Sequence, residues 1–135
     1  MATFTGTAAV QNFNGTAPVI DSVDYSTSPA GVTVDISLPG IPGAGGFAAG
    51  DTYASIDAFT LTSFGDLFTG DDDGNIVTGG AGQDFLFGGL GNDVFRIAAG
   101  DAVAGELYDG GTGGTDSIRL VTGGAGSTFD LRSVA

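Results

Sequence analysis

The sequence predicts an all-β fold in which short strands and glycine-rich turns alternate along a right-handed, flattened parallel coil. Three observations indicate this: a nine-residue repeat across residues 61–96, 26 glycines in 135 residues, and the predominance of Asp among the 16 acidic residues. Glycine allows tight turns with positive φ, and Asp favours turns over helices and strands. We expect residues 1–135 to form a single domain, because this length suits one domain and is short for two.

The repeat is clearest at residues 79–96, which hold two consecutive copies, GGAGQDFLF and GGLGNDVFR. In each copy the first six residues predict a turn, and the last three predict a minimal strand with an apolar middle residue. The same frame extends back through residues 70–78 and 61–69. Its sixth position reads Asp66, Asn75, Asp84 and Asp93, and its eighth position is apolar in all four copies. Residues 61–96 therefore form the expected core of repeats.

Two repeats, eighteen residues, are expected to close one turn of the coil. Turns eighteen residues apart then stack on one edge, about one strand spacing (~4.8 Å) from each other. This places Asp66 beside Asp84, and Asn75 beside Asp93. Stacked carboxylates repel each other, but a Ca²⁺ ion held between them by Asp oxygens and turn carbonyls converts that repulsion into attraction. The sequence thus predicts calcium between stacked turns.

The candidate calcium ligands all lie in these glycine- and aspartate-rich turns. The two clear repeats supply Gly79, Gly80, Gly82, Asp84, Gly88, Gly89, Gly91 and Asp93. The preceding turns supply Asp66, Asp71, Asp72, Asp73 and Asn75. Glycine-rich turns outside the core repeats add Asp51, Asp101, Asp109 and Asp116 as further candidates. Aspartate is also an ordinary turn residue, and an acidic run is often only a solvated surface. The shared register and the flanking glycines favour the metal-binding interpretation at positions 84 and 93.

The flanks of the repeats are less regular but also predict β-structure. In the flanking strands of residues 1–60, the strictly alternating run at 31–38 is the clearest strand, residues 39–50 form a Gly/Pro loop, and 51–60 return to a strand pattern. The C-terminal coils occupy residues 97–135, with a loop or short helical turn at 97–107. Residues 3–5 and 127–131 are both strand-like.

The charge of the chain restricts its chemistry and its partners. The net charge is −13, the only basic side chains are Arg96, Arg119 and Arg132, and there is no His, Lys or Cys. Such a charge argues against nucleic acid and against direct insertion into an anionic membrane. Most catalytic triads, thiol chemistry and Schiff bases are excluded, and no acidic pair is singled out for glycoside hydrolysis. We therefore expect a protein that is not an enzyme and whose natural ligand is a divalent cation.

The two clear repeats match the pattern GGxGxDxUx at every defining position, and the chain therefore resembles the repeats-in-toxin (RTX), or haemolysin-type calcium-binding, proteins. Residues 21–35 are similar to the segment that often precedes such repeats, and residues 55–66 to its connection into the first repeat. The pattern departs at Leu61, Asp73 and Asn75. The resemblance implies a parallel β-roll (a β-solenoid), folding triggered by external Ca²⁺, and type I secretion to the cell exterior or surface, which fits an N-terminus without a secretory signal pattern.

Two functions follow as hypotheses. In the first, the chain is a secreted calcium-binding structural protein that folds on extracellular Ca²⁺ and associates end to end with its own copies into filaments or a surface layer, because the ends of a coil expose unpaired strand edges. In the second, it is the calcium-dependent folding and secretion module of a larger exoprotein. A soluble monomer with frayed ends is the alternative to self-association.

Overall fold

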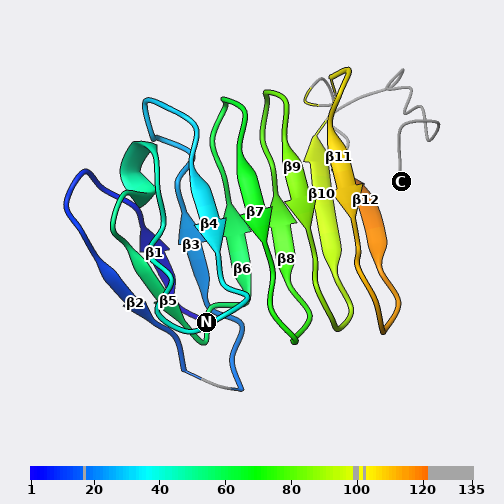
Figure 1. Cartoon of the computed structure of the whole chain (residues 1–135), viewed down its shortest axis with the longest axis horizontal. Coiled ribbons are helices and arrows are strands. Elements are labelled where there is room, and N and C mark those ends of the chain that lie inside the picture. Colours follow the sequence, from blue (N-terminus) through cyan, green and yellow to red (C-terminus); the bar gives the residue numbers. More distant parts are fainter. Residues whose placement is uncertain (17, 99–100, 102, 122–135) are drawn as a thin grey trace.

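The computed structural model describes residues 1–16, 18–98, 101 and 103–121. Short β-strands and turns make up almost all of this part, with one 3₁₀ turn, η1 (Gly46–Ala48). The strands follow one another along the long axis of the molecule (Figure 1). They are β1 (Thr3–Thr5), β2 (Asn12–Asn14), β3 (Ser22–Asp24), β4 (Thr33–Asp35), β5 (Thr52–Ala54), β6 (Ala58–Thr60), β7 (Leu67–Thr69), β8 (Ile76–Thr78), β9 (Phe85–Phe87), β10 (Val94–Ala98), β11 (Leu107–Asp109) and β12 (Ser117–Val121).

The strands form three sheets, and every pairing between them is parallel. Sheet A has the order β1-β3-β6-β8-β10-β12, sheet C the order β4-β7-β9-β11, and sheet B consists of β2 and β5. From β6 onward, successive strands alternate between sheet A and sheet C. The predicted all-β class with parallel strands is therefore confirmed.

The register of the central strands follows the predicted eighteen-residue step. Ala58 pairs with Ile76, and Ile76 pairs with Val94, within sheet A. Leu67 pairs with Phe85 within sheet C. The next steps are longer, because Phe85 pairs with Leu107 and Val94 pairs with Ser117. The extra residues are divided between β10, which has five residues instead of three, and the segments that connect β10 to β11 and β11 to β12. The strands nevertheless stay aligned.

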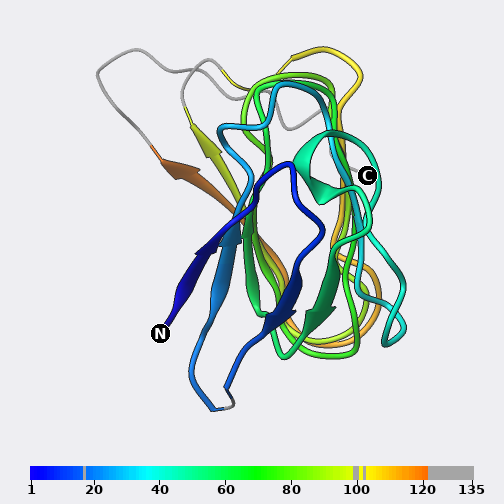
Figure 2. The same ribbon diagram turned by 90° about the vertical axis from the view of Figure 1, so that its left-hand side faces the viewer.

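In the amino-terminal part, sheet B, formed by β2 and β5, lies beside sheets A and C (Figure 2). Ser55, directly after β5, has a positive φ of 53° and turns the chain toward β6. The loop before β5 returns to the free edge of β4, where Thr33 and Ala44 form an isolated antiparallel bridge. This bridge covers the first edge of sheet C.

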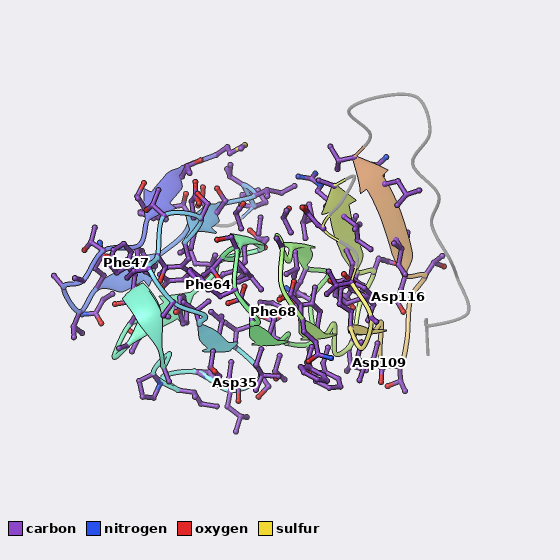
Figure 3. The ribbon with its side chains drawn as sticks, turned by 90° about the horizontal axis from the view of Figure 1, so that it is seen from above. Asp35, Phe47, Phe64, Phe68, Asp109 and Asp116 are labelled. Carbon is purple, nitrogen blue, oxygen red and sulfur yellow. The ribbon has the colours of Figure 1, made fainter. Side chains whose placement is uncertain are left out.

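The middle residue of each strand supplies the core. Val77, Leu86 and Phe95 are buried between sheets A and C, as the eighth position of the repeat predicts. Phe68 points into the same interior (Figure 3), and its ring centroid lies 5.2 Å from that of Phe59 on the opposite sheet. The buried apolar side chains therefore form one continuous stack between the sheets, which fixes the spacing of successive turns.

One sequence prediction about the flanks differs from the structure. The alternating run 31–38 contains only the three-residue strand β4, because Asp35 Oδ1 accepts hydrogen bonds from Ser37 N–H and Ser37 Oγ and turns the chain. The strand pattern predicted at residues 51–60 is confirmed and corresponds to two short strands, β5 and β6. Residues 3–5 do form a strand, whereas residues 127–131 lie outside the described part. No helix among the described residues is long and apolar enough to cross a membrane.

Candidate metal site

Acidic residues stand directly before most strands of both main sheets. The sheet A column consists of the residues before β1, β3, β6, β8, β10 and β12: Ala2, Asp21, Asp57, Asn75, Asp93 and Asp116. The sheet C column consists of the residues before β4, β7, β9 and β11: Val32, Asp66, Asp84 and Glu106. The strand register thus confirms the predicted stacking of Asp66 on Asp84 and of Asn75 on Asp93.

One oxygen of each stacked carboxylate accepts a hydrogen bond from the backbone of the preceding turn. Asp66 N–H donates to Asp84 Oδ1 (3.0 Å), and Asn75 N–H donates to Asp93 Oδ1 (2.7 Å). Asp93 N–H in turn donates to Asp116 Oδ1 (2.9 Å). These charge-assisted bonds join consecutive turns and fix the carboxylates in place.

The same contact occurs in upstream turns, including those of two acids that lie outside the repeats of residues 61–96, Asp21 and Asp57. Asp21 Oδ1 accepts a hydrogen bond from Ala2 N–H, and Asp57 Oδ2 accepts one from Asp21 N–H (3.1 Å). Asp51 Oδ1 accepts one from Gln11 N–H (2.7 Å). An acid directly before a three-residue strand with an apolar middle residue is the sequence pattern that these positions share.

The second oxygens separate the clear repeats from the weaker ones. Asp84 and Asp93 are completely buried, yet their Oδ2 atoms have no hydrogen-bond partner among the described residues. Glu106 Oε1 is also buried without a hydrogen-bond partner among the described residues. Buried polar atoms are normally paired, because an unpaired one loses its hydration without compensation. These three oxygens are therefore the atoms of the columns that a bound ligand would satisfy.

Asp66 and Asn75 differ from the acids of the clear repeats. Asp66 Oδ1 accepts from Val32 N–H (2.7 Å), and its Oδ2 accepts from Thr62 N–H (2.8 Å), so both oxygens are already used. Asn75 exchanges hydrogen bonds with Asp71 through its own amide, Oδ1 accepting from Asp71 N–H and Nδ2 donating to Asp71 Oδ1, each at 3.2 Å. The structure brings both residues into the columns but leaves neither with an unpaired side-chain atom.

Glycines make room for the unpaired oxygens. A Cβ atom on Gly79 would lie 2.5 Å from Asp84 Oδ2, and one on Gly88 would lie 2.3 Å from Asp93 Oδ2. Only a residue without a Cβ fits the first position of either turn in this arrangement. Later glycines of the same turns have positive φ, a conformation that other residues rarely adopt. They are Gly80, Gly82, Gly89 and Gly91.

Backbone carbonyls also gather between the stacked turns. The oxygen of Thr62 lies directly against Gly80 of the next turn, where an added Cβ would be only 1.9 Å from it. The oxygen of Asp71 lies against Gly89 in the same way, at 2.3 Å from an added Cβ, and it accepts a hydrogen bond from Leu90 N–H (2.9 Å). The space between turns is thus lined by carbonyl and carboxylate oxygens, the donors that hard cations prefer.

Burial makes four acids of the columns hard to ionise: Asp66, Asp84, Asp93 and Glu106. It raises the pKa of Asp84 to about 7, and the charges of Asp66, Glu106 and Asp101 contribute to the same direction. Burial likewise raises the pKa of Asp66, Asp93 and Glu106. Within the described residues, the only ion pair joins the N-terminal ammonium group to an acid outside this set. A bound cation would therefore stabilise the ionised form of these carboxylates.

The remaining predicted ligands occupy less enclosed positions. Asp72 and Asp73 are exposed, and Asp71 is partly buried beside Asn75. Asp109 is exposed at the end of β11, where its Oδ1 accepts from Gly111 N–H (2.9 Å), and Asp116 is exposed in the sheet A column. Figure 3 shows both at the β11–β12 end of the molecule. Asp101 is partly buried in the connection between β10 and β11.

The donor set restricts what could bind. No three His, Cys, Asp or Glu side chains converge as a metal-binding group in the described ranges. A cation between turns would therefore use one or two carboxylates together with backbone carbonyls and water, which suits Ca²⁺ and not a nitrogen- or sulfur-seeking metal. The chain matches no protein-family model, and a search of curated proteins finds no match either.

Proposed function

We propose that this chain is a calcium-binding structural protein of the β-roll type, similar to the RTX proteins, in which Ca²⁺ binds between stacked glycine-rich turns. One observation carries the proposal: the two acids of the clear repeats, Asp84 and Asp93, are each completely buried with one unpaired carboxylate oxygen. In both cases the other oxygen already bonds the preceding turn. In each acid, Oδ1 therefore bonds the preceding turn and Oδ2 is available to a cation.

Calcium would supply the positive charge that the columns lack. Asp84 and Asp93 would provide carboxylate ligands, with Gly79 and Gly88 leaving the space beside them. Turn carbonyls would complete a set of oxygen ligands of the kind that Ca²⁺ takes, typically six to eight. The proposed role is structural and not enzymatic.

Calcium binding would be coupled to folding. The chain carries a net charge of −13, and burial penalises the ionised form of Asp84. A cation that binds only the folded state adds its binding free energy to the free energy of folding. We propose that the chain remains largely unfolded where calcium is scarce and folds after type I secretion, where calcium is abundant.

The edges of sheet A support the proposal of end-to-end association. Strands β1 and β12 are the two outer strands of this sheet, and they run in the same direction. Within the described residues neither has a second neighbouring strand, whereas the corresponding edge of sheet C is bridged through Ala44. Leu120 and Val121 of β12 are exposed. Pairing of β12 with β1 of another copy would continue the parallel sheet and generate an open, filament-like contact.

Circular dichroism of the full chain tests the calcium proposal. In chelator at neutral pH we expect mainly coil, and addition of roughly millimolar Ca²⁺ should convert it to β-structure. Asp84→Asn and Asp93→Asn should each raise the calcium midpoint at least tenfold. Asp35→Asn removes the same charge outside the columns and should leave the midpoint unchanged. A spectrum that does not respond to chelation or to calcium refutes the proposal.

Electron microscopy with calcium and with chelator tests the association. Filaments or sheets that form only with calcium would support assembly through the ends of the coil. Dispersed particles in calcium, together with a normal folding transition, would instead favour the folding and secretion module of a larger exoprotein. A variant with Val121→Lys on the exposed edge of β12 should fold normally and lose the filaments.

A further inference from the structure

The last step of the sheet C column differs from the others. Asp84 is followed in this column by Glu106, the single glutamate of the chain. The two are 22 residues apart instead of eighteen, yet the register is kept, since Leu107 pairs with Phe85 and Leu107 N–H donates to the Asp84 carbonyl (2.9 Å). The sequence repeat ends at residue 96, so this turn is built by residues that the repeat pattern did not predict.

The hydrogen bonding of Glu106 also differs. In the earlier step of this column, the acid of the later turn accepts from the backbone N–H of the earlier one. Glu106 instead accepts through Oε2 from the hydroxyl of Tyr108 (2.8 Å), two residues later in β11. Burial raises the pKa of Tyr108, so its hydroxyl stays protonated and donates. Tyr108 thus fixes the carboxylate and leaves Oε1 available.

Two unpaired carboxylate oxygens belong to neighbouring turns at this point. Asp84 is completely buried and its Oδ2 has no partner among the described residues; Glu106 is only 8% exposed and the same is true of its Oε1. The charge of Glu106 is among those that raise the pKa of Asp84, after burial as the main cause. Two enclosed carboxylates without a countercharge are unfavourable unless a cation lies between them.

We propose that Asp84 and Glu106 bind a Ca²⁺ ion between their two turns, with Tyr108 as the residue that positions Glu106. The site lies outside the nonapeptide pattern, because one of its acids is a glutamate that follows an irregular connection. Its cation joins β11 to β9 and thereby extends the calcium-bound part of sheet C beyond the repeats. The inference rests on the proposed calcium function. The experiments below can refute the Asp84–Glu106 site without refuting calcium binding by the rest of the chain.

Terbium luminescence is a direct probe, because Tb³⁺ replaces Ca²⁺ and is excited by energy transfer from a nearby tyrosine. The other two tyrosines, Tyr25 and Tyr53, belong to the amino-terminal part of the core. We expect tyrosine-sensitised terbium luminescence in the full chain, displaced by excess Ca²⁺. Tyr108→Phe should remove most of this luminescence while the number of bound Ca²⁺ ions, measured by calorimetry, stays the same.

Glu106→Gln should give the complementary pattern. It should lower the calorimetric stoichiometry by one Ca²⁺ per chain and reduce the luminescence, with Tyr108 still present. Asp35→Asn, which removes one carboxylate from β4, should change neither quantity. If Glu106→Gln does not fold, Tyr108→Phe alone decides, because it keeps both carboxylates.

The outcomes separate the two proposals. Absence of calcium binding in the unmodified chain would refute the calcium function as a whole. Normal calcium-dependent folding, together with unchanged stoichiometry in Glu106→Gln or unchanged luminescence in Tyr108→Phe, would overturn the Asp84–Glu106 site alone. Loss of one ion in Glu106→Gln and loss of luminescence in Tyr108→Phe would support it.

Discussion

The backbone N–H of Asp66 donates a hydrogen bond to Oδ1 of Asp84, eighteen residues later, while Oδ2 of Asp84 is buried without a partner among the described residues. The same carboxylate therefore serves the stacking of the turns and leaves an oxygen for a ligand. Asp66 itself shows the alternative state, because Thr62 and Val32 satisfy both of its oxygens. The turn of Asp66 is thus closed by its own hydrogen bonds, whereas we propose that a cation closes the turn of Asp84.

The calcium-free chain should fold better in mild acid than at neutral pH. The folded-state pKa of Asp84 is about 7, above its ordinary value of 3.8. Its contribution to stability is fully present below about pH 4 and is lost as the pH rises through 7. Each pKa unit corresponds to about 1.4 kcal/mol. In chelator, the β-signal in circular dichroism should be larger at pH 5 than at pH 8.

Saturating calcium should reverse this order, because metal ligands must be ionised. Asp84→Asn should weaken the pH dependence in chelator, since one of the four buried acids with a raised pKa no longer titrates. An equal β-signal at both pH values in chelator would contradict the assignment of Asp84 as a buried, hard-to-ionise acid.

Replacing Asn75 by Asp should make folding more dependent on calcium. Asn75 is buried, and its amide Nδ2 donates to Asp71 Oδ1 (3.2 Å). Asn75→Asp removes this donor and places a carboxylate beside Asp71, at a cost of about 2 kcal/mol without metal. It also restores an acid at the sixth position. We expect less β-structure in chelator and at least one additional bound Ca²⁺ by calorimetry.

The control for this variant is Asn14→Asp, which makes the same charge change at an exposed position in β2. It should alter neither the calcium stoichiometry nor the folded fraction in chelator. If both variants behave alike, the effect at position 75 would come from net charge and not from the column.

The repeat predicted the central part of this fold because nine residues make one turn and one strand, and two such units make one coil of eighteen residues. Glycines and Asp84 mark a turn, and an apolar residue at the eighth position of each nine-residue repeat marks a strand with one buried side chain. The eighteen-residue register follows from these two facts alone. The flanks could not be predicted in the same way, since Ser55 takes a positive φ without being glycine and the loop around Ala44 closes an edge through a tertiary contact.

The site was predictable in its position and not in its details. Asp84 and Asp93 follow from the pattern. The hydrogen bond that occupies Asp66 Oδ2 comes from Thr62, a residue that no repeat position specifies. Glu106 escaped prediction because the connection before it breaks the nine-residue frame. Only the strand register aligns it with Asp84.

Gly79→Ala should weaken calcium binding more than it weakens the fold. Its Cβ would lie 2.5 Å from Asp84 Oδ2, so the carboxylate must move away from its position. We expect at least a tenfold rise in the calcium midpoint by circular dichroism. Gly40→Ala is the matched control, because no atom lies within 4 Å of its added Cβ. Its positive φ of 81° gives it a small folding cost of about 1 kcal/mol, without a change in calcium affinity.

If Gly79→Ala and Gly40→Ala shift the calcium midpoint equally, the space beside Asp84 has no special role. A shift confined to Gly79→Ala would place the ligand oxygen next to this glycine.

Tyr25→Phe should destabilise the protein without changing the number of bound calcium ions. The Tyr25 hydroxyl is buried, donates to Asp51 Oδ2 (2.6 Å) and lies 2.7 Å from the Tyr53 hydroxyl. Asp51 Oδ1 is bonded by Gln11 N–H, so Tyr25 supplies the partner of its second oxygen. In this turn a tyrosine takes the place that we propose for a cation in the repeats.

The substitution leaves Asp51 Oδ2 buried and unpaired, which costs about 1–3 kcal/mol. Urea denaturation at saturating calcium should show this loss, while the calorimetric stoichiometry stays that of the unmodified chain. Tyr53→Phe removes only the bond between the two hydroxyls and keeps the bond to Asp51, so its loss should be smaller. An unchanged urea midpoint in Tyr25→Phe would contradict the predicted loss of stability. A gain of one bound calcium ion would show instead that Asp51 can exchange its tyrosine partner for a cation.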